Sequence, residues 1–308
     1  MSQPLCPNFL QLGGNGLNGG FPEGISYLTN LRSLGLLAND LTGKIPSELG
    51  SLTQLERLNL KFNSISGKLP EEFWGLTKLS ILSLHGNKLV GTISSNIKRL
   101  TDLSTLYLSL NDLTGDIPRE VETLRQLSYL SLADNKLHGT IPTGIMQLTK
   151  LNGLLLRDND LSGTIPSGIE NLLELNLLYL GGNRFLGGEL PEGLWSLPVM
   201  ENLDLRGCNF TGSIGSNIGN MADLQELYLA NNPLSGTIPT EMARLELLEV
   251  MSIEGTQMKG PMPLEICQAK SQLTFFRADC YGTNPEFECT CCDECCDANG
   301  KNCKEART

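Results

Sequence analysis

The most regular feature of the chain is the spacing of its leucines and of the polar residues between them. In Leu34-Gly35-Leu36 two leucines alternate with a residue of another kind, which predicts a short strand with one face buried. The asparagine Asn39 follows, and then Gly43 and Pro46. Glycine permits a tight backbone and proline lacks a backbone donor, so we expect the strand ladder to end here and the chain to return.

This pattern recurs along the chain with a period of 24 residues. The frame L-x-x-L-x-L-x-x-N-x-L-x-G-x-I-P occurs eleven times, and one extra residue at Gly187-Gly188 lengthens the eighth step to 25. A fixed period of this size predicts a solenoid, in which each coil buries its leucines only by stacking on its neighbours.

The asparagines of the frame are expected to lie at a buried bend, because a side-chain amide both donates to and accepts from backbone groups. Cys208 and Thr256 are the departures from asparagine, and we expect Cys208 to be a free, buried thiol. Asn15 occupies the same place in the first copy of the frame. The predicted structural ladder consists of Asn39, Asn63, Asn87, Asn111, Asn135, Asn159, Asn183 and Asn232.

The frame resembles the leucine-rich repeat in its plant-type form, where Gly-x-Ile-Pro follows the asparagine. The resemblance implies a right-handed α/β-type solenoid, a horseshoe or superhelix of eleven 24-residue coils over residues 8–266, with a parallel β-sheet on its concave face. It also implies a non-catalytic domain that binds a protein or peptide in a receptor-like or secreted protein of signalling or defence, with a possible co-receptor. The alternative is a secreted inhibitor of hydrolases, similar to the plant polygalacturonase inhibitors.

The carboxy-terminal segment, residues 267–308, departs from the frame and is rich in cysteine. Leu273, Phe275 and Phe276 are expected to cover the last coil, because an open solenoid end exposes apolar side chains. Eight cysteines allow 105 pairings, so we assign none. A zinc-thiolate cluster is the competing interpretation. The resemblance favours disulfides, and the tail is similar to that of microalgal repeat proteins; its cysteines are Cys267, Cys280, Cys289, Cys291, Cys292, Cys295, Cys296 and Cys303.

The amino-terminal flank, residues 1–7, is short for a plant-type array, which usually begins with a cysteine-paired cap. This flank has only Cys6 and neither the basic start nor the apolar run of a secretory signal. We therefore expect an amino-terminally incomplete chain from an extracellular or cell-surface protein. Any signal peptide, membrane anchor or kinase domain would lie outside this chain.

Composition argues against several classes of function. A formal net charge of −11 leaves no basic stripe for nucleic acid or anionic lipid, and no apolar run reaches the length of a membrane span. The two histidines offer little for catalysis: His85 has only Ser109 near its column and no ordered acid. Asp134 and Asp158 could be interpreted as a pair of carboxylates or as part of a Ca²⁺ site. Neutralisation of the pair by the neighbouring Arg157 is the simpler interpretation. We expect no enzyme activity, no cofactor and no metal.

The strand positions that point away from the core carry the best candidates for binding. Four of the six tyrosines fall there, together with arginines and an aspartate, which is the composition of protein interfaces. The competing interpretation is that these side chains only solvate an exposed sheet. A third interpretation is an ice-binding surface, which would need regular rows of threonine. Charged residues interrupt such a row at Lys44, Lys68, Asp116 and Glu189. The predicted ligand-binding residues are Tyr107, Tyr129, Arg157, Tyr179, Asp204, Arg206 and Tyr228.

Overall fold

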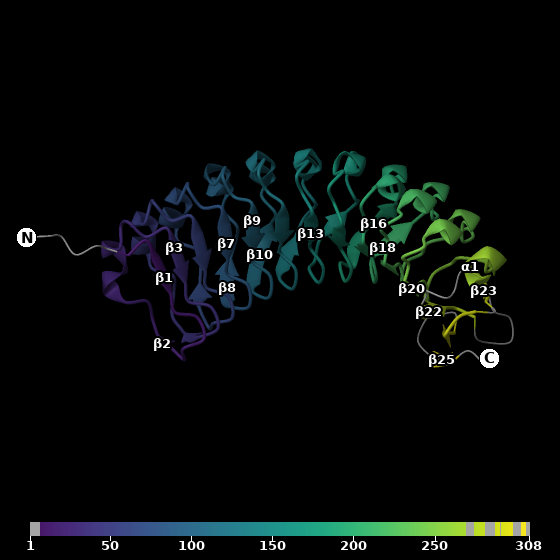
Figure 1. Ribbon diagram of the computed structural model, residues 1–308, viewed down its shortest axis with the longest axis horizontal. Helices are drawn as coiled ribbons and strands as arrows, with labels where there is room; N and C mark the ends of the chain where they lie inside the picture. Colours follow the sequence, from purple (N-terminus) through teal and green to yellow (C-terminus); the bar gives the residue numbers. More distant parts are fainter. Residues whose placement is uncertain (1–6, 269–273, 281–286, 290, 298–302, 306–308) are drawn as a thin grey trace, which may run out of the picture. The chain divides into compact units, whose positions relative to one another are not determined.

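The computed structural model describes residues 7–268, 274–280, 287–289, 291–297 and 303–305. Cys6 of the amino-terminal flank and Leu273 of the expected lid lie outside these ranges. The chain comprises two compact units, Met1–Leu151 and Asn152–Thr308. Figure 1 shows that strands and short helical turns alternate along each unit.

The first unit contains a main sheet of three-residue parallel strands, one from each repeat of the frame. The strands pair in register, so that Leu34 lies opposite Leu58 and Leu58 opposite Leu82. The central leucine of each of these three strands has 0% of its surface exposed. In sheet order the strands are β1 (Phe9–Gln11), β3 (Ser33–Gly35), β5 (Arg57–Asn59), β7 (Ile81–Ser83), β9 (Thr105–Tyr107) and β11 (Tyr129–Ser131).

Shorter parallel ladders form the next side of each coil in this unit, and 3₁₀ turns return the chain. Gly43, Gly67 and Gly91 all have φ between 77° and 87° there, the left-handed region that glycine adopts without strain. The ladders pair β2 (Asn18–Gly19) with β4 (Asp40–Leu41), and β6 (Ser66–Gly67), β8 (Lys88–Gly91), β10 (Asp112–Asp116) and β12 (Lys136–His138) in that order. The turns are η1 (Glu23–Tyr27), η2 (Ser47–Ser51), η3 (Glu71–Gly75), η4 (Ser95–Arg99), η5 (Arg119–Thr123) and η6 (Thr143–Gln147).

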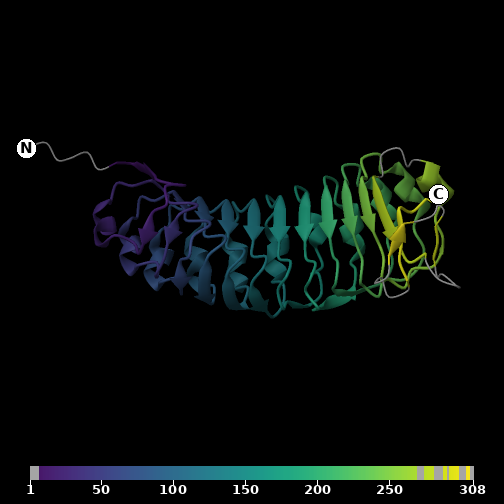
Figure 2. The same cartoon turned by 90° about the horizontal axis from the view of Figure 1, so that it is seen from below.

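The second unit repeats this plan, and its main-sheet strands appear as side-by-side arrows in Figure 2. Its main sheet, parallel except for the last pair, runs β13 (Gly153–Leu155), β15 (Leu177–Tyr179), β17 (Asn202–Asp204), β19 (Glu226–Tyr228), β20 (Val250–Ser252), β22 (Phe275–Ala278), β24 (Glu294–Cys295) and β25 (Lys304–Glu305). Its minor ladders are β14 (Ser162–Gly163), β16 (Phe185–Glu189) and β18 (Asn209–Thr211), then β21 (Gly260–Pro261) with β23 (Phe287–Glu288). Its helical turns are η7 (Ile169–Asn171), η8 (Glu192–Ser196), η9 (Ser216–Asn220), η10 (Thr240–Arg244) and α1 (Leu264–Gln268).

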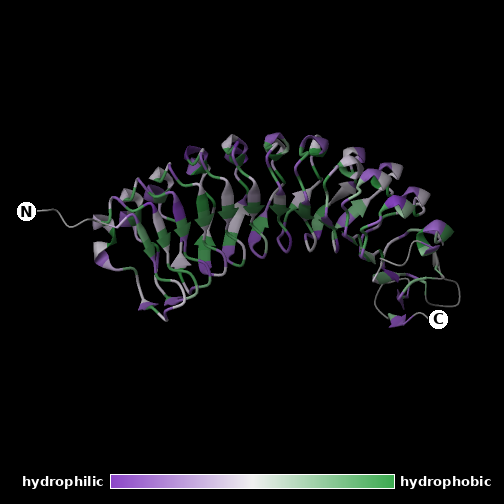
Figure 3. Ribbon diagram, viewed as in Figure 1, coloured by the Kyte–Doolittle hydropathy of each residue, from purple (hydrophilic) through white to green (hydrophobic). Residues whose placement is uncertain are grey.

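Prolines of the frame lie directly before most of the 3₁₀ turns. Pro46 has φ −74° and ψ 146°, an extended conformation that a proline ring favours, and its carbonyl accepts from the amide of Leu49. Leu49 is fully buried. Figure 3 shows hydrophobic colour on the strands and hydrophilic colour on many of the turns and loops. Each buried leucine stabilises the fold by roughly 1.5–3 kcal/mol.

The asparagine ladder joins each coil to the one before it within a unit. Asn111 accepts from the amide of Leu89 at 3.0 Å and donates to the carbonyls of Leu84 and Leu108 at 3.1 and 3.0 Å. Its side chain is one of the few polar groups that are buried. The amide thus satisfies main-chain groups that the bend leaves without a strand partner.

Cys208 takes the asparagine position in the second unit as a free thiol, as predicted. Its Sγ donates to the carbonyl of Leu180 at 3.3 Å, the bond that an asparagine nitrogen makes in other coils. Burial raises the pKa of this thiol to about 11. The cysteine is therefore a neutral donor in the ladder.

All eight cysteines of the tail are joined in disulfides: Cys267 with Cys291, Cys280 with Cys295, Cys289 with Cys292, and Cys296 with Cys303. Because each of these sulfur atoms is bonded to another, none of the eight cysteines is a free thiolate that could bind zinc. Phe276 is fully buried, but it is not part of a lid as expected. It lies in β22 opposite Met251 of β20, at the place of the central leucine, so Phe275 and Phe276 continue the main sheet by a further strand.

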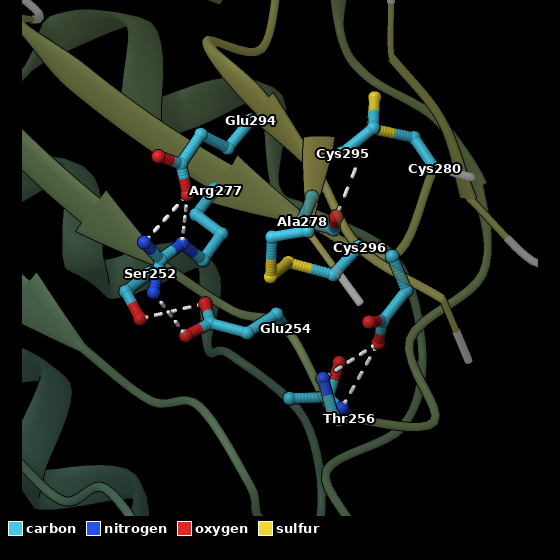
Figure 4. The surroundings of a disulfide bond; sticks show 12 residues. Ser252, Glu254, Thr256, Arg277, Ala278, Cys280, Glu294, Cys295 and Cys296 are labelled. Carbon is cyan, nitrogen blue, oxygen red and sulfur yellow. Dashed lines mark hydrogen bonds and ion pairs between the residues drawn. A yellow bond between two sulfur atoms is a disulfide. The ribbon is translucent and has the colours of Figure 1, made fainter. Parts of the chain in front are cut away.

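Polar side chains also attach this tail to the preceding strands (Figure 4). Arg277 of β22 donates through Nε to Glu294 at 2.7 Å, and its Nη1 lies 3.5 Å from the buried Glu254. Asp279, directly after β22, takes the ladder position and accepts from the amides of Gly255 and Thr256 at 2.7 and 3.2 Å. Within the described residues, no helix is long and apolar enough to cross a membrane.

Candidate ligand-binding site

In the second unit, strand register places three predicted binding residues in one row. Tyr179 of β15 lies opposite Asp204 of β17, and Asp204 lies opposite Tyr228 of β19. The side chains of neighbouring strands at such positions are close enough to contact one another. The central leucines of these strands point into the core, so this row lies on the outward face of the main sheet.

Asp204 holds Arg206 in place. Arg206 donates to the two carboxylate oxygens through Nε and Nη2 at 3.0 and 2.7 Å, and the Arg206 amide donates to the same carboxylate at 3.1 Å. The Arg206 guanidinium lies 4.4 Å from the ring centroid of Tyr228. The side chain of Asp204 is 6% exposed and that of Arg206 46% exposed. The bidentate ion pair with Asp204 and the contact with the Tyr228 ring therefore hold the Arg206 side chain in place while part of it still faces solvent.

The carboxylate of Asp204 is engaged by Arg206. It is buried and orients the arginine, while the predicted contact of Asp204 with a ligand stays a prediction. The same hydrogen bond raises the pKa of Arg206 above its ordinary value, with desolvation acting in the opposite direction.

Arg157 and Arg206 flank a hollow of about 280 Å³ on this face. Arg157 follows β13, is 46% exposed and lies 3.7 Å from the carboxylate of Asp158. Two glycines form part of the lining between the arginines: a Cβ at Gly181 would lie 2.7 Å from Asp204, and one at Gly182 would lie 2.3 Å from Asp158. The two glycines thus leave room for the carboxylates of Asp204 and Asp158, and the hollow is lined by two arginines and these two aspartates.

The tyrosines near this hollow are partly desolvated. Burial raises the pKa of Tyr179, and the carboxylates of Glu226 and Asp204 add to the rise while the two arginines oppose it. Burial also raises the pKa of Tyr228, with Glu226 again adding. Both phenols are therefore neutral donors at physiological pH, with part of each ring available to pack against a ligand.

The other two predicted tyrosines belong to the first unit. Tyr107 of β9 and Tyr129 of β11 pack edge to face, with ring centroids 6.5 Å apart. Burial, and then the neighbouring Tyr129, raises the pKa of Tyr107. The register places Tyr107 between Ser83 and Ser131, which are both buried. The two rings form a small aromatic cluster on the outward face.

The groups considered for catalysis are used otherwise. The ring of His85 packs edge to face on Phe62 at 4.9 Å, and burial followed by the charge of Lys61 lowers the pKa of His85. Ser109 is buried and shares a short hydrogen bond with Ser131. The serine hydroxyl is thus engaged away from the imidazole.

The sequence did not indicate one backbone feature of this face. The residue before the ladder position is left-handed along both units, including Phe62 with φ 55°, Leu110 with φ 51° and Asp158 with φ 52°. Glycine occupies the position in some coils, for example Gly86 and Gly182. The signal that could have revealed it is this alternation of Gly, Asp and Asn with bulky residues directly before the asparagine.

Comparisons with known proteins agree with the repeat. The family model described as "Leucine rich repeat" matches residues 29–89, and a second model of that description matches residues 126–148, 150–172, 200–221 and 223–245. No sequence among the curated proteins matches the chain.

Solved structures include similar chains. A TDR receptor is 30% identical with a TM-score of 0.83, and the match covers 88% of this chain and 46% of that one. The Arabidopsis receptor kinase HAESA, in complex with the peptide hormone IDA and the co-receptor SERK1, is 33% identical with a TM-score of 0.77, covering 86% and 48%. A plant ice-binding protein is 28% identical with a TM-score of 0.66, covering 81% and 80%.

The chain spans less than half the length of these two receptor chains. The repeat frame, the parallel main sheet, the asparagine ladder and the matching family models all lead to the same assignment. The chain is a leucine-rich repeat protein of the plant type.

Proposed function

We propose that this chain is a ligand-recognition domain that binds a peptide or a segment of a protein without chemical turnover. The predicted division assigns binding to the repeats of residues 8–266 and end-capping to residues 267–308. The four disulfides of the tail favour an oxidising, extracellular setting. A receptor-like or secreted protein of signalling or defence fits this arrangement.

The observation that carries the proposal is the fixed geometry of Arg206. Asp204 and Tyr228 hold its guanidinium from two sides, yet 46% of the side chain remains exposed. An arginine that is already ordered loses less entropy on binding than a free one. With Arg157 across the hollow, it suits an acidic group of an extended ligand, while Tyr179 and Tyr228 supply apolar contact.

The similar structures support this proposal. HAESA was solved with a peptide hormone and a co-receptor, and a further similar chain is the peptide hormone receptor RGFR1 in complex with RGF2, at 29% identity and a TM-score of 0.64. A co-receptor is therefore a reasonable second partner for this chain. We do not propose ice binding, because Lys44 and Asp116 place charges at positions that a threonine rank would need.

Selection from a random peptide library, followed by titration calorimetry with variants, tests this function. Tyr179→Ala, Arg157→Ala and Arg206→Ala should each weaken a selected peptide by roughly thirtyfold, the effect of losing an anchor worth about 2 kcal/mol. Tyr27→Ala and Arg244→Ala are matched controls on the 3₁₀ turns, where Tyr27 is 80% exposed. If the variants of Tyr179, Arg157 and Arg206 bind the peptide normally while the control variants lose binding, the site does not lie on the outward face of the main sheet.

A further inference from the structure

The second unit contains one sequence motif that the proposed function does not use. Asn209-Phe210-Thr211 is an Asn-x-Thr motif, the acceptor of N-linked oligosaccharides, and no other Asn-x-Ser or Asn-x-Thr occurs in the chain. These three residues form β18, in which Phe210 is fully buried while Asn209 and Thr211 are exposed. Since side chains alternate along a strand, the asparagine and the threonine both point to solvent on one face.

The fold makes no use of the Asn209 side chain, which directly precedes the buried Phe210. In the first unit, two residues that directly precede buried leucines, Asp112 and Lys136, form an ion pair of 2.6 Å between coils. Among the described residues, by contrast, the Asn209 amide makes no side-chain hydrogen bond. Attachment of a sugar to its nitrogen therefore disrupts no contact of the fold.

The coils on both sides leave room next to Asn209. Asn209 lies opposite Gly187 of β16, and a Cβ at this glycine would lie 2.8 Å from the Cβ of Asn209. On the other side, the ladder β14-β16-β18 ends with β18. The next coil has Pro233 directly before the buried Leu234, and proline lacks the amide that a further strand would need. Asn209 therefore lies on an edge strand with a glycine beside it.

Phe185 supplies an apolar surface near Asn209. It precedes the fully buried Leu186 on β16, as Asn209 precedes Phe210 on β18, and 66% of its surface is exposed. It lies two residues before Gly187, the partner of Asn209, so the two side chains are diagonal neighbours. Such neighbours are roughly 7–8 Å apart, which is within reach of an aromatic ring.

We propose that Asn209 carries an N-linked oligosaccharide and that the first sugar packs on the ring of Phe185. In this transfer Nδ2 of Asn209 bonds to C1 of a lipid-diphosphate-linked oligosaccharide, the lipid diphosphate leaves from C1, and the amide gives up one proton. A phenylalanine ring offers a large apolar area, which the apolar face of a sugar covers. The modification takes place in the secretory pathway, so it rests on the extracellular setting of the proposed function.

The first experiment locates the oligosaccharide. An added, cleavable signal peptide directs the chain into the secretory pathway of eukaryotic cells. The secreted protein, with its disulfides intact, is analysed by mass spectrometry before and after an amidase removes N-linked oligosaccharides. We expect one oligosaccharide, on the peptide that contains Asn209. Asn209→Gln and Thr211→Ala should abolish it and Thr211→Ser should retain it, while Asn217→Gln, at an exposed asparagine outside the motif, is the matched control.

The second experiment tests the contact with Phe185. Thermal unfolding is measured for the modified chain and for Asn209→Gln, each with Phe185 and with Phe185→Ala. We expect the oligosaccharide to raise the unfolding temperature when Phe185 is present, and most of this rise to be lost with Phe185→Ala. Leu173→Ala removes another exposed apolar side chain of this unit and should leave the rise unchanged.

Two results would overturn the proposal. A secreted chain with bridged tail cysteines and an unmodified Asn209 would show that the motif is not used. An oligosaccharide that stabilises the Phe185→Ala chain equally well would remove the ring from this site, and would leave Phe185 to the hollow of about 320 Å³ that it lines with Asp160 and Arg184. The proposed function is tested separately, because peptide binding that depends on Arg206 is measured on the unmodified Asn209→Gln chain.

Discussion

Replacing Asp279 by asparagine is expected to stabilise the last coils of the protein at neutral pH. Asp279 performs the task of a ladder asparagine, since its Oδ2 accepts from the amides of Gly255 and Thr256. Its other oxygen, Oδ1, is buried and has no hydrogen-bond partner. In Asn232 the corresponding nitrogen donates to the carbonyls of Leu205 and Leu229. A carboxylate therefore brings a charge to a place where the frame uses a neutral donor.

The size of the effect follows from the pKa of this carboxyl. Burial raises the pKa of Asp279 to about 6 from 3.8, and the charges of Glu254 and Asp297 add to the rise while the two amides oppose it. The difference of about two pH units corresponds to about 3 kcal/mol between the two protonation states. We expect Asp279→Asn to stabilise these coils by roughly 1–3 kcal/mol at neutral pH.

The difference between the proton affinities of Asp279 in the folded and unfolded states determines how its contribution to stability changes with pH. The folded state binds the proton more tightly than the unfolded chain, so the favourable contribution of Asp279 is fully present below about pH 4 and is lost as pH rises through about 6. Asp279→Asn stays neutral throughout. Its advantage over the natural chain should therefore be larger at pH 7.5 than at pH 4.5.

Hydrogen exchange of the peptides around Gly255 reports this local stability. It is measured at both pH values with the disulfides intact, and the rates are corrected for the intrinsic exchange rate. Urea unfolding gives the global free energy beside it. Asp223→Asn, at an exposed position of the same unit, is the matched control. An Asp279→Asn variant with unchanged protection, or with a gain that is equal at the two pH values, would refute the reasoning.

Three further outcomes are expected. Asn111→Ala should lower the free energy of unfolding by about 1–3 kcal/mol, because it removes the amide that bonds Leu84, Leu89 and Leu108; an unchanged urea midpoint would contradict the ladder. Mass spectrometry of the non-reduced protein should find the tail cysteines bridged, and free thiols at most of them, or bound zinc, would disprove the disulfide cap. Cys208 should resist thiol reagents until the protein unfolds, since its pKa is about 11 and it is buried; rapid labelling of the native protein would contradict this.

The sequence was sufficient to predict the repeat, the main-sheet strands and the ladder, because each depends on residue types at a fixed period. Leu34, Asn39 and Gly43 each have a role that recurs at the 24-residue period, so one register explains them all. The free thiol at Cys208 followed from the same register.

Features that depend on single contacts could not be read from the period. The carboxylate of Asp204 is buried because Arg206 folds back on it, which no spacing rule specifies. Asp279 lies in a segment without the leucine frame, so its ladder role emerges only from its contacts with Gly255 and Thr256. The pairing of the tail cysteines likewise needed the folded tail, because eight cysteines alone leave 105 choices.

Photo-cross-linking at Tyr179 tests the central claim most directly, namely that the outward face of the main sheet in the second unit binds the ligand. A photoreactive phenylalanine analogue replaces Tyr179 in one variant and the exposed Tyr27 of η1 in a matched control, and each is irradiated with a selected peptide that Arg206→Ala weakens. The account predicts a covalent peptide adduct at position 179 and none at position 27. An adduct at position 27, with position 179 unlabelled, would contradict it.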